Sequence, residues 1–84
     1  MNIYVGNLDY RVNENDLNDI FAEYGTVSSA KIIMDKYEGR SKGFGFVEME
    51  NQDEAKKAIT ELNGATVENR QITVNEAKPR KTSY

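Results

Sequence analysis

The chain of 84 residues lacks cysteine and histidine, and it contains a single proline. The first two absences exclude disulfides, thiol chemistry and the usual zinc ligands, so we expect neither a metal ion nor another cofactor. No apolar run approaches the roughly 18 residues that cross a bilayer, and a strand pattern begins directly after Met1. We therefore expect no membrane contact and no signal peptide. The sequence predicts one soluble, cytoplasmic domain.

Positive charge is also scarce, because 11 Lys and Arg residues face 14 Asp and Glu residues and give a net charge of −3. That sum argues against a polyanionic partner, but the distribution of charge matters more than the sum. Acidic side chains gather in residues 13–24, whereas basic side chains gather in residues 36–42 and 78–84. We expect residues 78–84 to form a flexible basic tail after a domain of residues 1–77. The alternative is that these are ordinary solvated surface charges.

Aromatic side chains are few, yet two of them alternate in the segment 42–49, Lys-Gly-Phe-Gly-Phe-Val-Glu-Met. On a strand, alternate side chains share one face, so Lys42, Phe44 and Phe46 point to one side while Val47 points to the other. The side with Val47 is suited to covering a core. Adjacent phenyl rings on a solvated face usually serve a partner. Flat rings beside a cation suit unstacked nucleobases on a phosphate backbone.

Turn residues and hydrophobic spacing predict four strands and two helices. The expected elements are strands at residues 3–8, 27–35, 43–50 and 71–75, a helix at 14–24, and a helix that follows residue 51 and ends at 63–64. Asn13 and Asn51 stand where N-caps are expected, and a short extended piece at 66–67 turns into the last strand. The order β-α-β-β-α-β with right-handed crossovers predicts an α+β fold. Its four-stranded antiparallel sheet has the order 4-1-3-2, with both helices on one face and the other face open.

The first strand, residues 3–8, places Tyr4 outward between two inward apolar residues. The predicted strand order puts this ring beside the two phenyl rings at the centre of the open face. The segment 42–49 resembles the RNP1 signature of the RNA recognition motif, with agreement at six of the seven specified positions. Met49 replaces the final aromatic residue, on the core-facing side, where methionine can fill the same volume. The first strand resembles RNP2, the second signature of that family.

The resemblance covers residues 1–77 and is greatest to small, free-standing bacterial members of the RNA recognition motif family. It implies a ferredoxin-like fold and binding of single-stranded RNA, with some capacity for single-stranded DNA. Bases would stack on Tyr4 and Phe44, and Phe46 would contact a sugar. Asn75 offers an amide edge to a base, although asparagine is equally a residue of turns and strand ends. Lysine and arginine residues would contact the backbone. The candidate RNA-binding residues are Tyr4, Asn7, Lys31, Arg40, Lys42, Phe44, Phe46, Asn75, Ala77, Lys78 and Arg80.

The exposed rings and the predicted topology are also compatible with three alternatives to RNA binding. Aromatic residues suit strands and pair with one another without any ligand. Acylphosphatase-like hydrolases share the same topology, but the sequence shows no base paired with a nucleophile, so we expect no enzyme. A protein-binding variant of the domain is the third alternative, and the acidic segment 13–24 leaves room for a protein partner on the helical face. We expect a monomer, and the bacterial resemblance implies a role as a post-transcriptional regulator or an RNA chaperone.

Overall fold

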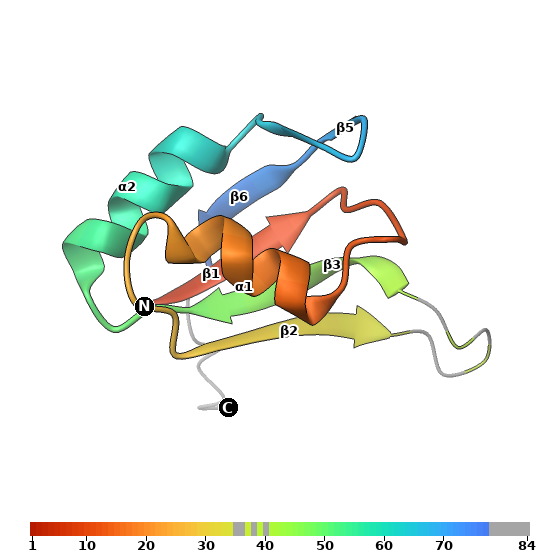
Figure 1. The fold of residues 1–84 in the computed structure, drawn as a ribbon, viewed down its shortest axis with the longest axis horizontal. Coiled ribbons are helices and arrows are strands. Elements are labelled where there is room, and N and C mark those ends of the chain that lie inside the picture. The colour runs from red at the N-terminus through yellow and green to blue at the C-terminus, as the bar shows by residue number, and fades with distance from the viewer. Residues whose placement is uncertain (35–36, 38, 40, 78–84) are drawn as a thin grey trace, which may run out of the picture.

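Among the residues that the structure describes, two helices lie against one face of a four-stranded antiparallel sheet (Figure 1). This computed structural model describes residues 1–34, 37, 39 and 41–77, with the backbone alone at residues 41 and 42. The elements, in chain order, are β1 (Asn2–Gly6), α1 (Glu14–Ala22), β2 (Ser29–Met34), β3 (Ser41–Glu48), α2 (Gln52–Leu62), β4 (Thr66–Val67), β5 (Arg70–Gln71) and β6 (Thr73–Glu76). The large sheet has the order β2-β3-β1-β6, which confirms the predicted order and the ferredoxin-like α+β fold.

The predicted last strand is divided into two short strands in the structure. β5 pairs with β4 in a separate two-stranded ladder, whereas β6 pairs with β1 in the large sheet. Between them, the N–H of Ile72 donates to the carbonyl of Ala65, and the carbonyl of Ile72 accepts from the N–H of Gly64. The β4–β5 hairpin turns at Glu68 and Asn69, whose φ values of 51° and 68° suit a two-residue hairpin loop. The prediction of one continuous last strand is therefore wrong.

The other predicted elements are present, and their ends differ from the expected ends by a few residues. β1 stops short of its expected end because Asn7 takes a left-handed φ of 58°, after which the N–H of Leu8 donates to the carbonyl of Gly43 at 2.8 Å. Asparagine tolerates this backbone conformation better than most residues. Helix α1 also ends early, where the N–H of Tyr24 bonds to the carbonyl of Phe21, three residues back instead of four.

The core lies between the sheet and the two helices. Its buried apolar side chains are Ile3, Val5, Leu8, Val12, Leu17, Phe21, Ile32, Val47, Met49, Ala55, Ala58, Leu62, Ile72 and Val74. Full burial of each large member contributes about 1.5–3 kcal/mol to folding. Met49 is fully buried, so the departure from the RNP1 pattern does fall on the core side. Because side chains alternate along a strand, the residues between these core positions point to the open face.

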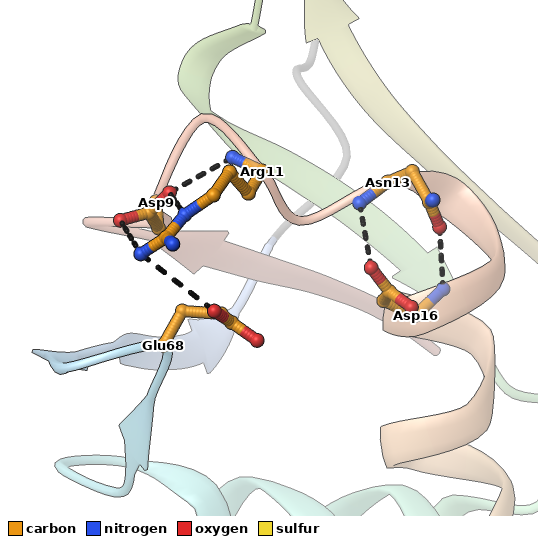
Figure 2. Close-up of polar contacts among 5 residues, drawn as sticks. All are labelled: Asp9, Arg11, Asn13, Asp16 and Glu68. Atoms are coloured by element: carbon orange, nitrogen blue, oxygen red, sulfur yellow. Dashed lines mark hydrogen bonds and ion pairs between the residues drawn. The ribbon is translucent and has the colours of Figure 1, made fainter.

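Both helices begin at an asparagine whose side chain caps the helix, as the sequence predicts. At α1, Oδ1 of Asn13 accepts from the N–H of Asp16 at 2.8 Å, and Oδ2 of Asp16 accepts from the N–H of Asn13 at 3.2 Å (Figure 2). This reciprocal pair is a capping box. At α2, Oδ1 of Asn51 accepts from the N–H of Glu54 at 2.9 Å. Within the described residues, neither helix has the length and apolar character needed to span a membrane.

An Asn13→Ala variant is expected to lose about 1 kcal/mol of unfolding free energy, because the N–H of Asp16 loses its acceptor. For a domain of this size, that loss lowers the midpoint of thermal unfolding by about 4–8 °C, which circular dichroism measures. Asn18→Ala is the matched control, since Asn18 is exposed within α1 and alanine is the better helix former. Equal midpoints for the two variants would contradict the capping role.

Candidate nucleic-acid interface

The open face of the large sheet carries a row of four side chains, one from each strand. Phe46 of β3 lies opposite Lys31 of β2 on one side and opposite Tyr4 of β1 on the other. Tyr4 in turn lies opposite Asn75 of β6. Opposite residues on neighbouring strands point to the same face, so the row crosses the whole sheet. Strand pairing thus brings together four predicted site residues that are far apart in the sequence.

Tyr4, Phe44 and Phe46 form a cluster on this face, which we call the ring trio. The ring centroids are 6.0 Å apart for Tyr4 and Phe44, 5.9 Å for Tyr4 and Phe46, and 6.2 Å for the two phenylalanines. These separations are typical of interacting aromatic pairs. Tyr4 and Phe44 are the most nearly parallel pair, at 33°, whereas Phe46 meets them at 64° and 89°. Mutual contact holds the rings in place before any ligand arrives, which lowers the entropy lost on binding.

The ring trio remains accessible although its members pack against one another. Phe46 is 38% exposed, and Tyr4 and Phe44 are half-buried. The next residue, Val47, is 1% exposed on the opposite face. The predicted division of β3 into an apolar inner face and an aromatic outer face is therefore confirmed. Lys31 and Asn75 are exposed on the strands at the two edges of the sheet.

Two further predicted residues lie at opposite ends of β1. The N–H of Ala77 donates to the carbonyl of Asn2 at 2.8 Å, which keeps the chain beside β1 after β6 ends. Past the other end of β1, Nδ2 of Asn7 donates to the carbonyl of Gln71 at 2.6 Å, and its Oδ1 accepts from Nη2 of Arg70 at 2.7 Å. The amide of Asn7 therefore joins β1 to β5. Its assignment as a base contact stays a prediction.

The remaining predicted contacts are cations that the structure does not describe. Arg40, Lys78 and Arg80 lie outside the described residues, and so does the side chain of Lys42. The backbone of Lys42 belongs to β3, two residues before Phe44. Phosphate contacts by these four residues stay predictions.

Charged residues beyond the end of β1 join the following loop to the β4–β5 hairpin, as Figure 2 shows. Arg11 donates to Oδ1 of Asp9 from its backbone N–H at 2.9 Å and from Nε at 3.1 Å, and its Nη2 lies 3.7 Å from Oε2 of Glu68. The side-chain hydrogen bond from Arg11 is the main cause of a pKa of Asp9 below its ordinary value. Arg11 thus pairs with both carboxylates.

Sequence reasoning missed Arg70, which lies beside this cluster and bonds to Asn7. No local pattern marks Arg70, because it becomes a neighbour of β1 only through the β4–β5 hairpin. The signal that could have found it is the turn at Glu68 and Asn69. That turn predicts a hairpin, and a hairpin at this place returns the chain toward the end of β1.

An open antiparallel sheet with exposed rings, backed by two helices, defines a class of nucleic-acid-binding domain. Residues 3–73 match the family model of the RNA recognition motif, and the chain belongs to that family. It is 51% identical over 80 residues to RbpD of Nostoc sp. (strain PCC 7120), a candidate RNA-binding protein by name, and the match covers 95% of this chain and 85% of RbpD.

Two solved structures also resemble the chain. The crystal structure of RNA binding protein PG1 is 52% identical with a TM-score of 0.91, over 96% of this chain and 98% of that chain. The structure described as a complex of the Sxl-lethal protein with RNA is 30% identical with a TM-score of 0.89, over 98% of this chain and 49% of that chain. Both likenesses cover nearly the whole chain.

Proposed function

We propose that the protein binds single-stranded RNA on the open face of its sheet. The observation that carries this proposal is the ring trio, three accessible rings held within 6.2 Å of one another at the centre of that face. Unstacked bases find flat apolar partners there, whereas a paired and stacked duplex does not expose its bases in this way. The family assignment supports the proposal, because a relative with the same fold is described in a complex with RNA.

Phe44 and the four residues of the row have distinct roles in this proposal. Bases stack on Tyr4 and Phe44, the most nearly parallel pair of rings. Phe46 contacts the sugar between them. Asn75 lies opposite Tyr4 and offers an amide edge to the base above it, and Lys31 lies opposite Phe46 and contacts a phosphate.

The residues outside the described part of the chain extend this interface in the proposal. Arg40 and Lys42 contact the RNA backbone next to Phe44. Residues 78–84 form a basic tail after the domain of residues 1–77, and Lys78 and Arg80 of that tail contact phosphates. Ala77 lies close to a base. Contacts to phosphates position the strand and carry no sequence information.

The proposed contacts set the scale of affinity. Base stacking on aromatic side chains is worth about 1–3 kcal/mol per base, so three rings offer about 3–9 kcal/mol. Association costs about 4 kcal/mol or more in lost translational and rotational freedom. With phosphate contacts added, we propose micromolar affinity for two to four nucleotides and modest sequence preference.

The family and the acidic surface of α1 support proposals on the cellular role and partners of the protein. We propose a cytoplasmic monomer that also has some capacity for single-stranded DNA and serves as a post-transcriptional regulator or an RNA chaperone. Proteins of this family bind RNA and are generally not enzymes, which supports a binding role without catalysis. Exposed carboxylates along α1, among them Glu14, Asp16 and Asp19, support a protein partner with basic groups on the helical face.

A titration of a fluorescently labelled single-stranded RNA tests the proposed function. We expect a dissociation constant in the micromolar range by fluorescence anisotropy, and binding at least about tenfold weaker to a duplex of the same sequence, because its bases are already stacked. The duplex is the control for charge, since its two strands carry more phosphate charge at a higher density than the single strand does. Equal affinity for the two RNAs would mean that charge alone drives binding, and the proposal would fail.

A further inference from the structure

The ring trio borders a hollow that extends past the end of β1. The hollow has a volume of about 250 Å³, and its walls are Tyr4, Asn7, Leu8, Tyr10, Gly43, Phe44 and Arg70. Two of these residues belong to the ring trio, and the others come from β3, the loop after β1 and the β4–β5 hairpin. The volume lies below the roughly 300–1,000 Å³ of pockets for drug-sized ligands. The volume of this hollow is better suited to part of a single nucleotide, such as its base or its phosphate.

Arg70 supplies the positive charge of this hollow. Its Nη2 donates to Oδ1 of Asn7 at 2.7 Å, and within the described residues its guanidinium makes one hydrogen bond. A guanidinium has five N–H donors, so most of them are available to a ligand. Asn7 is itself held, because its Nδ2 donates to the carbonyl of Gln71. One side of the guanidinium is therefore anchored, and it needs little ordering to bind an anion.

The neighbouring carboxylates are paired with a different cation. The nearby carboxylates are those of Asp9 and Glu68. Nε of Arg11 lies 3.1 Å from Oδ1 of Asp9, and Nη2 of Arg11 lies 3.7 Å from Oε2 of Glu68 (Figure 2). Neither carboxylate forms an ion pair with Arg70 among the described residues. Attraction from Arg70 adds least to the lowering of the Asp9 pKa, which Arg11 dominates. Arg70 therefore forms no ion pair among the described residues, and its planar guanidinium suits the oxygens of a phosphate in the hollow.

Tyr10 gives the hollow an aromatic wall. Its side chain belongs to the loop after β1 and is 60% exposed, so its ring is accessible to a ligand. The lining of the hollow thus includes two rings of the trio, the ring of Tyr10 and the guanidinium of Arg70. Aromatic surface next to an available cation is the combination that single-stranded nucleic acid requires.

We propose that Arg70 and Tyr10 form an additional nucleotide subsite, next to the base that stacks on Tyr4 and Phe44. Arg70 binds a phosphate of the adjacent nucleotide, and Tyr10 packs against its base. This inference rests on the proposed function and extends the RNA path beyond the end of β1. It assigns specific roles to two residues that lie outside both signature strands.

Oligonucleotides of increasing length test this subsite. For uridine oligonucleotides of two to six residues, Arg70→Gln is expected to leave the shortest unaffected, because they occupy the ring trio alone. It should weaken the longer ones by about fivefold to tenfold and reduce the slope of log affinity against log salt by about 0.7, the value for one phosphate. Tyr10→Ala should weaken the same longer oligonucleotides and leave the salt slope unchanged.

Lys57→Gln is the matched control, because it removes the same charge from an exposed position on α2, on the helical side of the sheet. If Arg70→Gln and Lys57→Gln weaken the long oligonucleotides equally, Arg70 does not hold a specific phosphate and the subsite is wrong. A loss of equal size at every length also overturns it. Should the unsubstituted protein bind none of the oligonucleotides, the proposed function itself fails. Thermal unfolding of each variant shows whether it is folded, and Tyr10→Ala tests the subsite without touching the bond to Asn7.

Discussion

A Gly45→Ala variant is expected to melt far below the unsubstituted protein, although it adds only one methyl group. Gly45 is buried in β3 and pairs with Val5 of β1 and Ile32 of β2. A Cβ atom at this position would overlap the carbonyl oxygen of Lys31 and lie 3.2 Å from the Cα of Ile32. Both are backbone atoms, which cannot rotate away as a side chain can. Overpacking costs about 1–3 kcal/mol, and a clash with backbone belongs at the upper end.

A loss of about 3 kcal/mol lowers the midpoint of thermal unfolding by about 12–24 °C in a domain of this size. Gly64→Ala is the comparison variant, because it adds a methyl group without a steric clash. Gly64 has a φ of 87°, and no described heavy atom lies within 4 Å of its Cβ position. That variant carries only the strain of a left-handed alanine, about 1–2 kcal/mol. Circular dichroism should therefore rank Gly45→Ala as the less stable variant. The opposite ranking would show that β2 can move away from β3 at a small cost in free energy.

The fold was predictable to the extent that its signals are local. Alternation along β1 and β3 assigned Ile3 and Val47 to the core and Tyr4 to the open face, and the burial of each agrees. Helical spacing after Asn13 and Asn51 located both helices, since the caps and the apolar stripe lie within a few residues of each other. These signals come from neighbouring residues, so the sequence displays them directly.

The errors arose where long-range contacts decide the structure. The last strand divides because Ile72 bonds to Gly64 and Ala65, and no local signal records those partners. The amide of Asn7 bonds to Arg70 and Gln71, about 64 residues away along the chain, and no local pattern predicts these partners, while its role as a base contact stays a prediction. The hollow beside the rings was missed for the same reason. Its walls come from three segments that meet only in the folded protein.

Joint replacement of Tyr4 and Phe44 by leucine is expected to abolish most RNA binding. Stacking is worth about 1–3 kcal/mol per base, and leucine retains some apolar contact, so we expect a combined loss of about 2–4 kcal/mol. That corresponds to an affinity about 30- to 700-fold weaker for a single-stranded RNA. The ring centroids are 6.0 Å apart, and effects of residues in contact do not add simply. Fluorescence anisotropy on the two single variants and the double variant measures this coupling.

Val47→Ala distinguishes loss of the binding face from loss of the fold. Val47 is 1% exposed on the opposite side of β3, so its truncation should cost about 2 kcal/mol of stability and lower the melting midpoint by about 8–16 °C. Measured well below that midpoint, its affinity for RNA should equal that of the unsubstituted protein. The double leucine variant should do the reverse, with a nearly unchanged midpoint and weak binding. If Val47→Ala loses affinity while folded, or the double variant unfolds, the assignment of the two faces of β3 to core and ligand is wrong.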